Sequence, residues 1–302
     1  MDTITLLQGD PDSNLTPLIL VHAISGLALP YFALGPLSEI EEDRPVYGIS
    51  SPMFTSTLAN PPGDTLSQMA EEYVTTVRRE IQPFGPYLLG GWSMGGMIAM
   101  EMAAILQAQG DEVPHVILID SVNPRYFPAF QDKKQHDIQA ALTYNAIATR
   151  MNAPAIPLFQ CGLFEDDYYS SSGDESNNDS DTEEFAEDLS VPEMLGRMRK
   201  HIHQGLGVLA SQKSRVDEFD FSETEVTLIR CTVRESIDSL VNDRRKILAQ
   251  KRSQDNTLLW PAENFKSFKT LTIDATHDGC FDAEHADELT FLVKDVLDNL
   301  EY

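Results

Sequence analysis

The sequence predicts an α/β fold with a mostly parallel central sheet, helices on both faces of the sheet and a helical lid insertion. Short apolar runs alternate with helical patterns along the 302 residues. Runs that stay apolar throughout are typical of parallel strands buried on both faces. The interval 126–221 lacks such runs and looks helical at both flanks, which predicts an insertion between two strands. A chain of this length can bury a large core without disulfide or metal staples.

The expected elements alternate in chain order. Strands are expected at 18–21, 45–49, 87–89, 116–119, 226–229 and 271–273. Helices are expected at 66–80, where apolar residues recur at helical spacing, at 94–109 and at about 283–299. These elements assign residues 1–125 and 222–302 to a core. They leave residues 126–221 as a lid over a site or, alternatively, as a surface insertion without a role.

The charge of the chain excludes some classes of partner. The 48 acidic and 22 basic residues give a net charge of −26, which disfavours nucleic acid and anionic membranes as partners. Eleven of the acidic residues, and no Lys or Arg, lie within 165–188. This tract has almost nothing apolar to bury, so we expect it to be disordered.

Sequence features of cellular location favour the cytoplasm. No apolar run reaches the roughly 20 residues that a membrane span requires. The first ten residues have neither a basic start nor an apolar stretch of signal-peptide length. Three scattered cysteines, Cys161, Cys231 and Cys280, are too few for a disulfide framework or a zinc site.

The sharpest chemical signal is the motif Gly91-Trp92-Ser93-Met94-Gly95. It directly follows an expected strand and directly precedes an expected helix. In that setting the serine of a G-x-S-x-G motif occupies a sharp, strained turn, and its hydroxyl stands clear of the sheet. Ser93 is therefore the candidate nucleophile. The alternative is a glycine-rich helix start at which Ser93 only caps the helix.

A serine nucleophile needs a base that is oriented by an acid, and in this architecture the chain order is serine, acid, histidine. Of the seven histidines, only His277 lies between the last expected strand and the terminal helix, in a loop at the same sheet end as Ser93. His115 is expected at the opposite end, and His201 and His203 fall in the lid. His277 is therefore the candidate base.

The acid has two candidate positions. Asp120 ends the strand expected at 116–119, where the sheet would orient its carboxylate beside Ser93. After the next strand the chain offers only Glu235, with Asp238 further on, and a loop would have to aim either of them. Asp120 is favoured, although it could instead be a turn or helix-capping residue. Asp278 is adjacent to the candidate histidine and cannot easily reach its ring.

An oxyanion formed at Ser93 would need backbone N–H donors. One is expected from Met94, the residue after the nucleophile. The other is expected from the loop at 22–26, which follows the first expected strand and contains small residues that allow a close approach. His22 is interpreted as a structural histidine that bonds the backbone of this loop.

These features together resemble the type I thioesterases, the α/β-hydrolases that release products from polyketide, nonribosomal peptide and fatty acid synthases. The resemblance covers nearly the whole chain and rests on residues 22–26, 91–96, 119–121 and 276–278. It implies the α/β-hydrolase fold with a helical lid, and it supports Asp120 as the acid. It also implies that Ile24 supplies the second oxyanion donor.

The resemblance implies a reaction and a partner as well. An acyl chain would arrive as a thioester on the phosphopantetheine arm of an acyl or peptidyl carrier protein, and no other cofactor is expected. Ser93 would become acylated with His277 as base, and hydrolysis or cyclisation would release the product. The loop at 278–281 matches the family pattern only approximately, which leaves the substrate preference open.

Carrier docking would have to overcome the negative charge of the chain. The lid holds a basic cluster, Arg197, Arg199 and Lys200, that could meet the carrier or its phosphate, although such a run on a helix is more often a solvated face.

Two other functions compete with carrier-bound acyl release. One is a carboxylester hydrolase or lipase that acts on free esters with the same residues. The other is a non-catalytic scaffold that binds a carrier protein, which the presence of both serine and histidine disfavours. The sequence shows no metal cluster, phosphate-cradling loop or nicotinamide motif.

Overall fold

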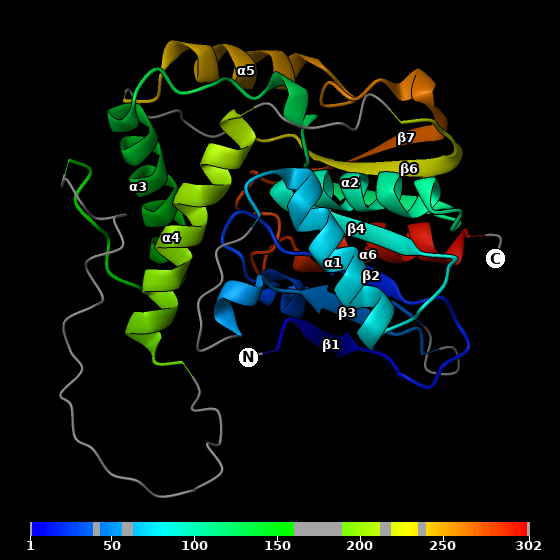
Figure 1. Ribbon diagram of the computed structural model, residues 1–302. Coiled ribbons are helices and arrows are strands. Elements are labelled where there is room, and N and C mark those ends of the chain that lie inside the picture. Colours follow the sequence, from blue (N-terminus) through cyan, green and yellow to red (C-terminus); the bar gives the residue numbers. More distant parts are fainter. Residues whose placement is uncertain are drawn as a thin grey trace, which may run out of the picture.

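The computed structural model describes residues 2–38, 43–55, 63–159, 189–211, 219–234 and 240–300. Within these ranges, seven strands form one sheet across the centre of the molecule (Figure 1). They are β1 (Ile4–Gln8), β2 (Leu18–Val21), β3 (Val46–Ile49), β4 (Leu88–Trp92), β5 (His115–Ile119), β6 (Phe221–Cys231) and β7 (Phe265–Ile273). Their order in the sheet is β1-β3-β2-β4-β5-β6-β7, and all neighbours pair in parallel except β1, which runs antiparallel to β3.

Helices cover both faces of this sheet, as the apolar strands predict. Helices α1 (Leu66–Glu80) and α2 (Met94–Ala108) share one apolar cluster with strand residues such as Leu89 and Leu118. Helix α6 (Ala286–Asp298) shares another with Leu88 and Ile117, which point to the opposite face. Because successive side chains of a strand alternate between faces, strands buried on both sides must be apolar at every position.

The parallel register brings distant parts of the chain to one edge of the sheet. Trp92 at the end of β4 pairs with Ile119 at the end of β5, and Ile119 pairs with Ile229 in β6. Cys231 at the end of β6 in turn pairs with Ile273 at the end of β7. Residues that follow these strands therefore gather at the same edge, although the chain separates them by many residues.

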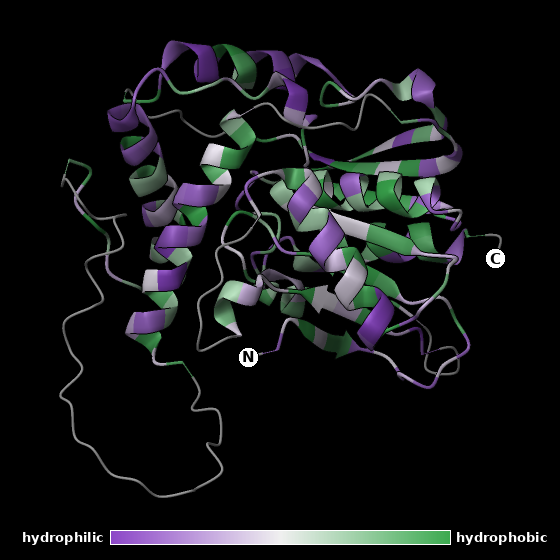
Figure 2. Cartoon of the chain, in the orientation of Figure 1, coloured by the Kyte–Doolittle hydropathy of each residue, from purple (hydrophilic) through white to green (hydrophobic). Residues whose placement is uncertain are grey.

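The structure also contains two elements that the sequence patterns did not indicate. Strand β1 lies at the edge of the sheet and is only partly buried, so it lacks an uninterrupted apolar run. Helix α5 (Asp243–Gln254) has no fully buried residue and is mostly hydrophilic (Figure 2), so no apolar stripe marks it. Strands β6 and β7 are longer than expected. Their additional residues include polar side chains, so no uninterrupted apolar run marked them in the sequence.

The interval 126–221 contributes helices α3 (Lys133–Arg150) and α4 (Val191–Ala210), which stand side by side at one end of the sheet (Figure 1). They pack on each other and on Leu27, Met53 and Phe54 of the core through a third apolar cluster. The acidic tract at 165–188, predicted to be disordered, lies outside the described residues. No helix in the described ranges is long and apolar enough to cross a membrane.

Polar contacts attach α4 to the core. The Arg197 guanidinium donates to the carbonyl of Met53 at 2.7 Å. The fully buried His201 donates from Nδ1 to the carbonyl of Ile24 at 3.0 Å, and its ring packs edge-on against His22 with 4.9 Å between centroids. His22 bonds the Ala23 carbonyl at 2.7 Å, as its structural interpretation predicts.

Because these two histidines are buried, the free energy of unfolding should depend on pH in the acidic range. It lowers the pKa of His22 to about 3 and that of His201 to about 4, and for His22 the neighbouring His201 adds to the effect. The ordinary value is about 6.5. Below that pH the unfolded chain therefore binds protons that the folded chain does not bind.

We expect the free energy of unfolding to fall as the pH drops from about 6.5 towards 4. The contribution of His201 is of the order of 2–3 kcal/mol, so His201→Gln should flatten this part of the profile. Urea unfolding at pH 8, 7, 6, 5 and 4.5 would measure it. Between pH 7 and 8 the two proteins should show the same slope. A wild-type-like slope in the variant below pH 6.5 would contradict the assignment.

Candidate active site

Ser93 lies at the sharp turn between β4 and α2, in the setting that the motif predicts. Its backbone has φ 58° and ψ −121°, a conformation that L-residues rarely adopt. A Cβ atom at Gly95 would lie 2.1 Å from the carbonyl oxygen of Val21, and one at Gly91 would lie 2.3 Å from the Gly95 carbonyl carbon. Only glycine fits at these two positions, and their close packing supports the strained turn that presents the Ser93 hydroxyl.

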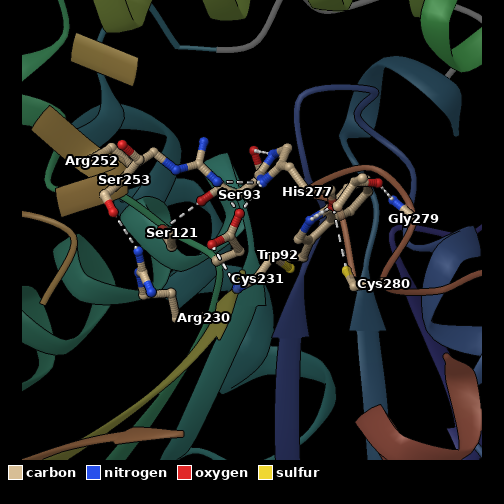
Figure 3. Close-up of polar contacts among 12 residues, drawn as sticks. Trp92, Ser93, Ser121, Arg230, Cys231, Arg252, Ser253, His277, Gly279 and Cys280 are labelled. Carbon is tan, nitrogen blue, oxygen red and sulfur yellow. Dashed lines mark hydrogen bonds and ion pairs between the residues drawn. The ribbon is translucent and has the colours of Figure 1, made fainter. Parts of the chain in front are cut away.

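The three side chains predicted as a triad form one hydrogen-bonded chain, and Figure 3 shows Ser93 and His277 within it. The Ser93 Oγ lies 2.9 Å from His277 Nε2, and His277 Nδ1 lies 2.6 Å from Asp120 Oδ2. The three residues come from the turn after β4, the end of β5 and the loop after β7. The parallel register of those strands brings them together.

Asp120 is held rigidly at the end of β5. Its backbone has φ 44°, and its N–H donates to the Ile229 carbonyl at 2.8 Å. Its Oδ1 accepts the backbone N–H of Cys231 at 3.1 Å, and its side chain is fully buried. Burial acts to raise the pKa of Asp120, but the Arg252 guanidinium and the His277 bond outweigh it and hold that pKa below the usual value. The carboxylate is therefore ionised at neutral pH.

Arg252 is a site residue that sequence reasoning missed. It lies on α5, and its Nη2 contacts Asp120 Oδ2 and lies 3.1 Å from His277 Nδ1 (Figure 3). Nothing in the sequence marks it, because α5 is an exposed, highly charged helix without an apolar stripe. The guanidinium supplies a positive charge that partly offsets the burial of the carboxylate.

Of the other acids considered from the sequence, the structure describes Asp278 alone. Glu235 and Asp238 lie outside the described residues. Asp278 lines the cavity next to His277. Within the described ranges, no group of three or more His, Cys, Asp or Glu side chains is arranged to hold a metal ion.

Trp92 connects the turn at Ser93 to the loop that carries His277, which the sequence patterns did not predict. Its indole Nε1 donates to the His277 carbonyl at 3.2 Å, and its backbone N–H donates to the Tyr31 hydroxyl at 2.8 Å. The Tyr31 hydroxyl in turn donates to the Val21 carbonyl at 2.6 Å. The rings of Trp92 and His277 lie 5.5 Å apart between centroids. This network sets where the histidine loop lies relative to Ser93.

The two predicted oxyanion residues, Ile24 and Met94, line the same cavity as Ser93. Met94 is the first residue of α2, and such a position leaves its N–H without a partner inside the helix. The carbonyl of Ile24 accepts a hydrogen bond from His201 on α4, so this helix contacts the loop at 22–26.

A cavity of about 700 Å³ opens beside Ser93, between the sheet edge and helices α3, α4 and α5. Much of its lining is apolar and includes Leu29, Phe127, Leu142, Ile147, Leu206 and Phe281. Helix α5 falls in the range assigned to the core, yet its Arg245 and Arg252, and Val241 just before it, also line the cavity. The enclosure is therefore built by more of the chain than the interval 126–221.

The predicted docking residues lie on α4, outside the lining of this cavity. Arg197 bonds the Met53 carbonyl, so it helps to attach α4 to the core. The Arg199 guanidinium lies 5.9 Å from the centroid of the Tyr144 ring on α3. A docking role for Arg197, Arg199 and Lys200 stays a prediction.

Comparison with known proteins identifies relatives of this chain. The thioesterase domain family matches residues 16–161. The thioesterase pytI of Aspergillus terreus is 45% identical over 311 residues, which cover 100% of both chains. The thioesterase pynI of Aspergillus niger is 38% identical over 305 residues, 99% of this chain and 100% of the relative. A non-reducing polyketide synthase of Gibberella zeae is 43% identical over 122 residues, 40% of this chain and 6% of the synthase.

Solved structures agree in fold. The NocB thioesterase domain has a TM-score of 0.60 at 24% identity, covering 97% of this chain and 99% of that domain. The RedJ thioesterase of Streptomyces coelicolor has a TM-score of 0.57 at 16% identity, covering 95% and 92%. The α/β-hydrolase fold implied by the sequence resemblance is thus confirmed. Since a thioesterase is 45% identical along its whole length, the chain belongs to the thioesterase family of α/β-hydrolases.

Proposed function

We propose that this thioesterase releases an acyl chain, a polyketide or a related product, from the phosphopantetheine thioester of a carrier protein. The observation that carries the proposal is the chain Ser93–His277–Asp120, with contacts of 2.9 and 2.6 Å, opening onto a largely apolar cavity of about 700 Å³. Two thioesterase relatives cover the whole chain, and other relatives are polyketide synthases, which supports this substrate class.

In the first step Ser93 Oγ attacks the thioester carbonyl carbon while His277 Nε2 accepts the hydroxyl proton. Asp120 accepts the Nδ1–H of His277 and stabilises the imidazolium that forms. The backbone N–H groups of Ile24 and Met94 donate to the developing oxyanion. When the intermediate collapses, the carbon–sulfur bond breaks, the pantetheine thiol takes the proton from His277, and the acyl group remains as an ester on Ser93.

In the second step a nucleophile releases the acyl group from Ser93. His277 takes a proton from water, or from a hydroxyl or amine of the acyl chain itself, and the new nucleophile attacks the ester carbonyl. His277 then returns the proton to the Ser93 oxygen, which leaves. Water gives a free acid and an internal nucleophile gives a ring. Neither step calls for a resident metal or cofactor.

The serine should be indispensable for product release. Ser93→Ala should lower kcat/KM by about 10⁴-fold or more, because triad members act as a unit. A serine-directed phosphonate should label the wild type once, measured by intact mass, and should not label the variant. Ser253→Ala on α5, whose hydroxyl bonds the Gln250 carbonyl within the same helix, is the matched control and should keep wild-type labelling. Labelling of Ser93→Ala at a comparable rate would place the nucleophile elsewhere.

The assignment of the acid predicts a rank order. Asp120→Asn should lower kcat by several orders of magnitude, about 10⁴-fold in comparable triads, since the histidine loses the group that orients it. His277→Ala should lose at least as much because proton transfer is removed. Glu235→Gln should be nearly silent. Steady-state kinetics on one thioester would rank the three variants, and a crippled Glu235→Gln beside an active Asp120→Asn would reverse the assignment.

The substrate class separates this proposal from a lipase or carboxylesterase. We expect higher kcat/KM for an acyl N-acetylcysteamine thioester than for the oxygen ester of the same acyl chain. A graded series of chain lengths, followed by intact mass spectrometry, would show which acyl groups load onto Ser93 and which products leave. Preference for the oxygen ester would favour the esterase, and failure of every ester to load would favour a carrier-binding scaffold.

A further inference from the structure

Three arginines line the cavity beside Ser93, and two of them have a carboxylate partner. Arg150 at the end of α3 pairs with Asp282 at 2.6 Å, and Arg252 pairs with Asp120. Arg245, near the beginning of α5, differs from both. Among the described residues no carboxylate forms an ion pair with Arg245, and its buried Nε and Nη2 atoms have no hydrogen-bond partner.

Two aromatic rings hold the Arg245 guanidinium in place. Its central carbon lies 4.5 Å from the centroid of Phe127 and 4.3 Å from that of Phe130. Contacts of this kind stabilise the cation and orient the guanidinium. They leave the hydrogen-bonding capacity of its N–H groups unused, because a ring face stabilises the charge without accepting all five donors.

The positive charge of Arg245 is partly buried, and no described residue supplies a counter-charge. Burial lowers the pKa of Arg245 to about 10, which still leaves the side chain protonated at neutral pH. A partly buried cation without a counter-charge is unfavourable, and an anion that enters the same low-dielectric space is attracted more strongly than it would be in water. Arg150 and Arg252 in the same wall have carboxylate partners, so Arg245 is the one lining arginine among the described residues without an ion pair.

We propose that Arg245 binds an anionic oxygen group of the thioester substrate. The planar fork of a guanidinium matches a carboxylate, an acidic enol or a phosphate, and it can donate two parallel hydrogen bonds. Such a group could belong to the acyl chain, or it could be the phosphate of the pantetheine arm. The inference rests on the proposed function, because it assigns a specificity-determining residue to that reaction.

The test compares anionic and neutral substrates on matched variants. Arg245→Gln removes the charge, and Arg245→Lys keeps the charge but not the fork. Arg244→Gln is the control, because Arg244 is the exposed neighbour on the same helix. One substrate pair consists of N-acetylcysteamine thioesters that end in a carboxylate or in its methyl ester. A second pair carries one neutral acyl chain on N-acetylcysteamine or on phosphopantetheine.

We expect Arg245→Gln to raise KM for one anionic substrate at least tenfold more than for its neutral partner, with a smaller effect on kcat. Arg245→Lys should recover part of this difference, and Arg244→Gln should show none. A selective loss with the acyl carboxylate assigns the anion to the acyl chain. A selective loss with phosphopantetheine assigns it to the arm.

Equal changes for both members of both pairs would overturn the proposal and leave Arg245 as a structural clamp between two rings. Thermal unfolding of each variant, measured alongside, reports any loss of folding. If Arg245→Gln does not fold, the same comparison with Arg245→Lys decides, because loss of the fork alone should still separate the pairs. Wild-type turnover of the neutral N-acetylcysteamine thioester tests the proposed function separately, since that substrate carries no anion.

Discussion

The close approach of the α2 backbone to the end of β2 is the constraint on which the site depends. Gly95 leaves no room for a side chain against the Val21 carbonyl, so α2 can begin directly on the sheet. That contact supports the strained turn at Ser93, with φ 58°. Strain of this kind persists only where the surroundings over-determine it. Here the buried parallel strands on both sides provide that support, and the Tyr31 hydroxyl links Val21 to the backbone of Trp92.

Electrostatics at the far end of the triad depends on a helix that carries no core residue. The Asp120 carboxylate is fully buried, and burial alone would favour its neutral form. Arg252 from α5, the His277 bond and the Cys231 N–H supply the opposing interactions and keep it ionised. An ionised acid is what a triad requires, because it must accept the histidine N–H and stabilise the imidazolium. Helix α5 thus contributes a charge beside Asp120 and no fully buried side chain.

Specific contacts join the helices that enclose the cavity to the loops beside Ser93 and His277. His201 on α4 bonds the Ile24 carbonyl, so α4 contacts the proposed oxyanion loop directly. Arg150 on α3 pairs with Asp282, which belongs to the loop that follows His277. The walls between these contacts are mostly apolar. A displacement of α3 or α4 would therefore change the contacts of the 22–26 loop or of the loop after His277, as well as the shape of the cavity.

The sequence by itself determined the parallel sheet, the nucleophile turn and the identity of the three triad candidates. Apolar runs, glycine spacing and the order of the motifs along the chain can be recognised in the sequence itself. Tertiary structure alone decided the contacts of Trp92, His201, Arg245 and Arg252. Two of these lie on α5, which has no apolar periodicity, and each acts through a partner far away in the chain. Which charges are buried together depends on how distant segments pack, and no single segment of sequence records that.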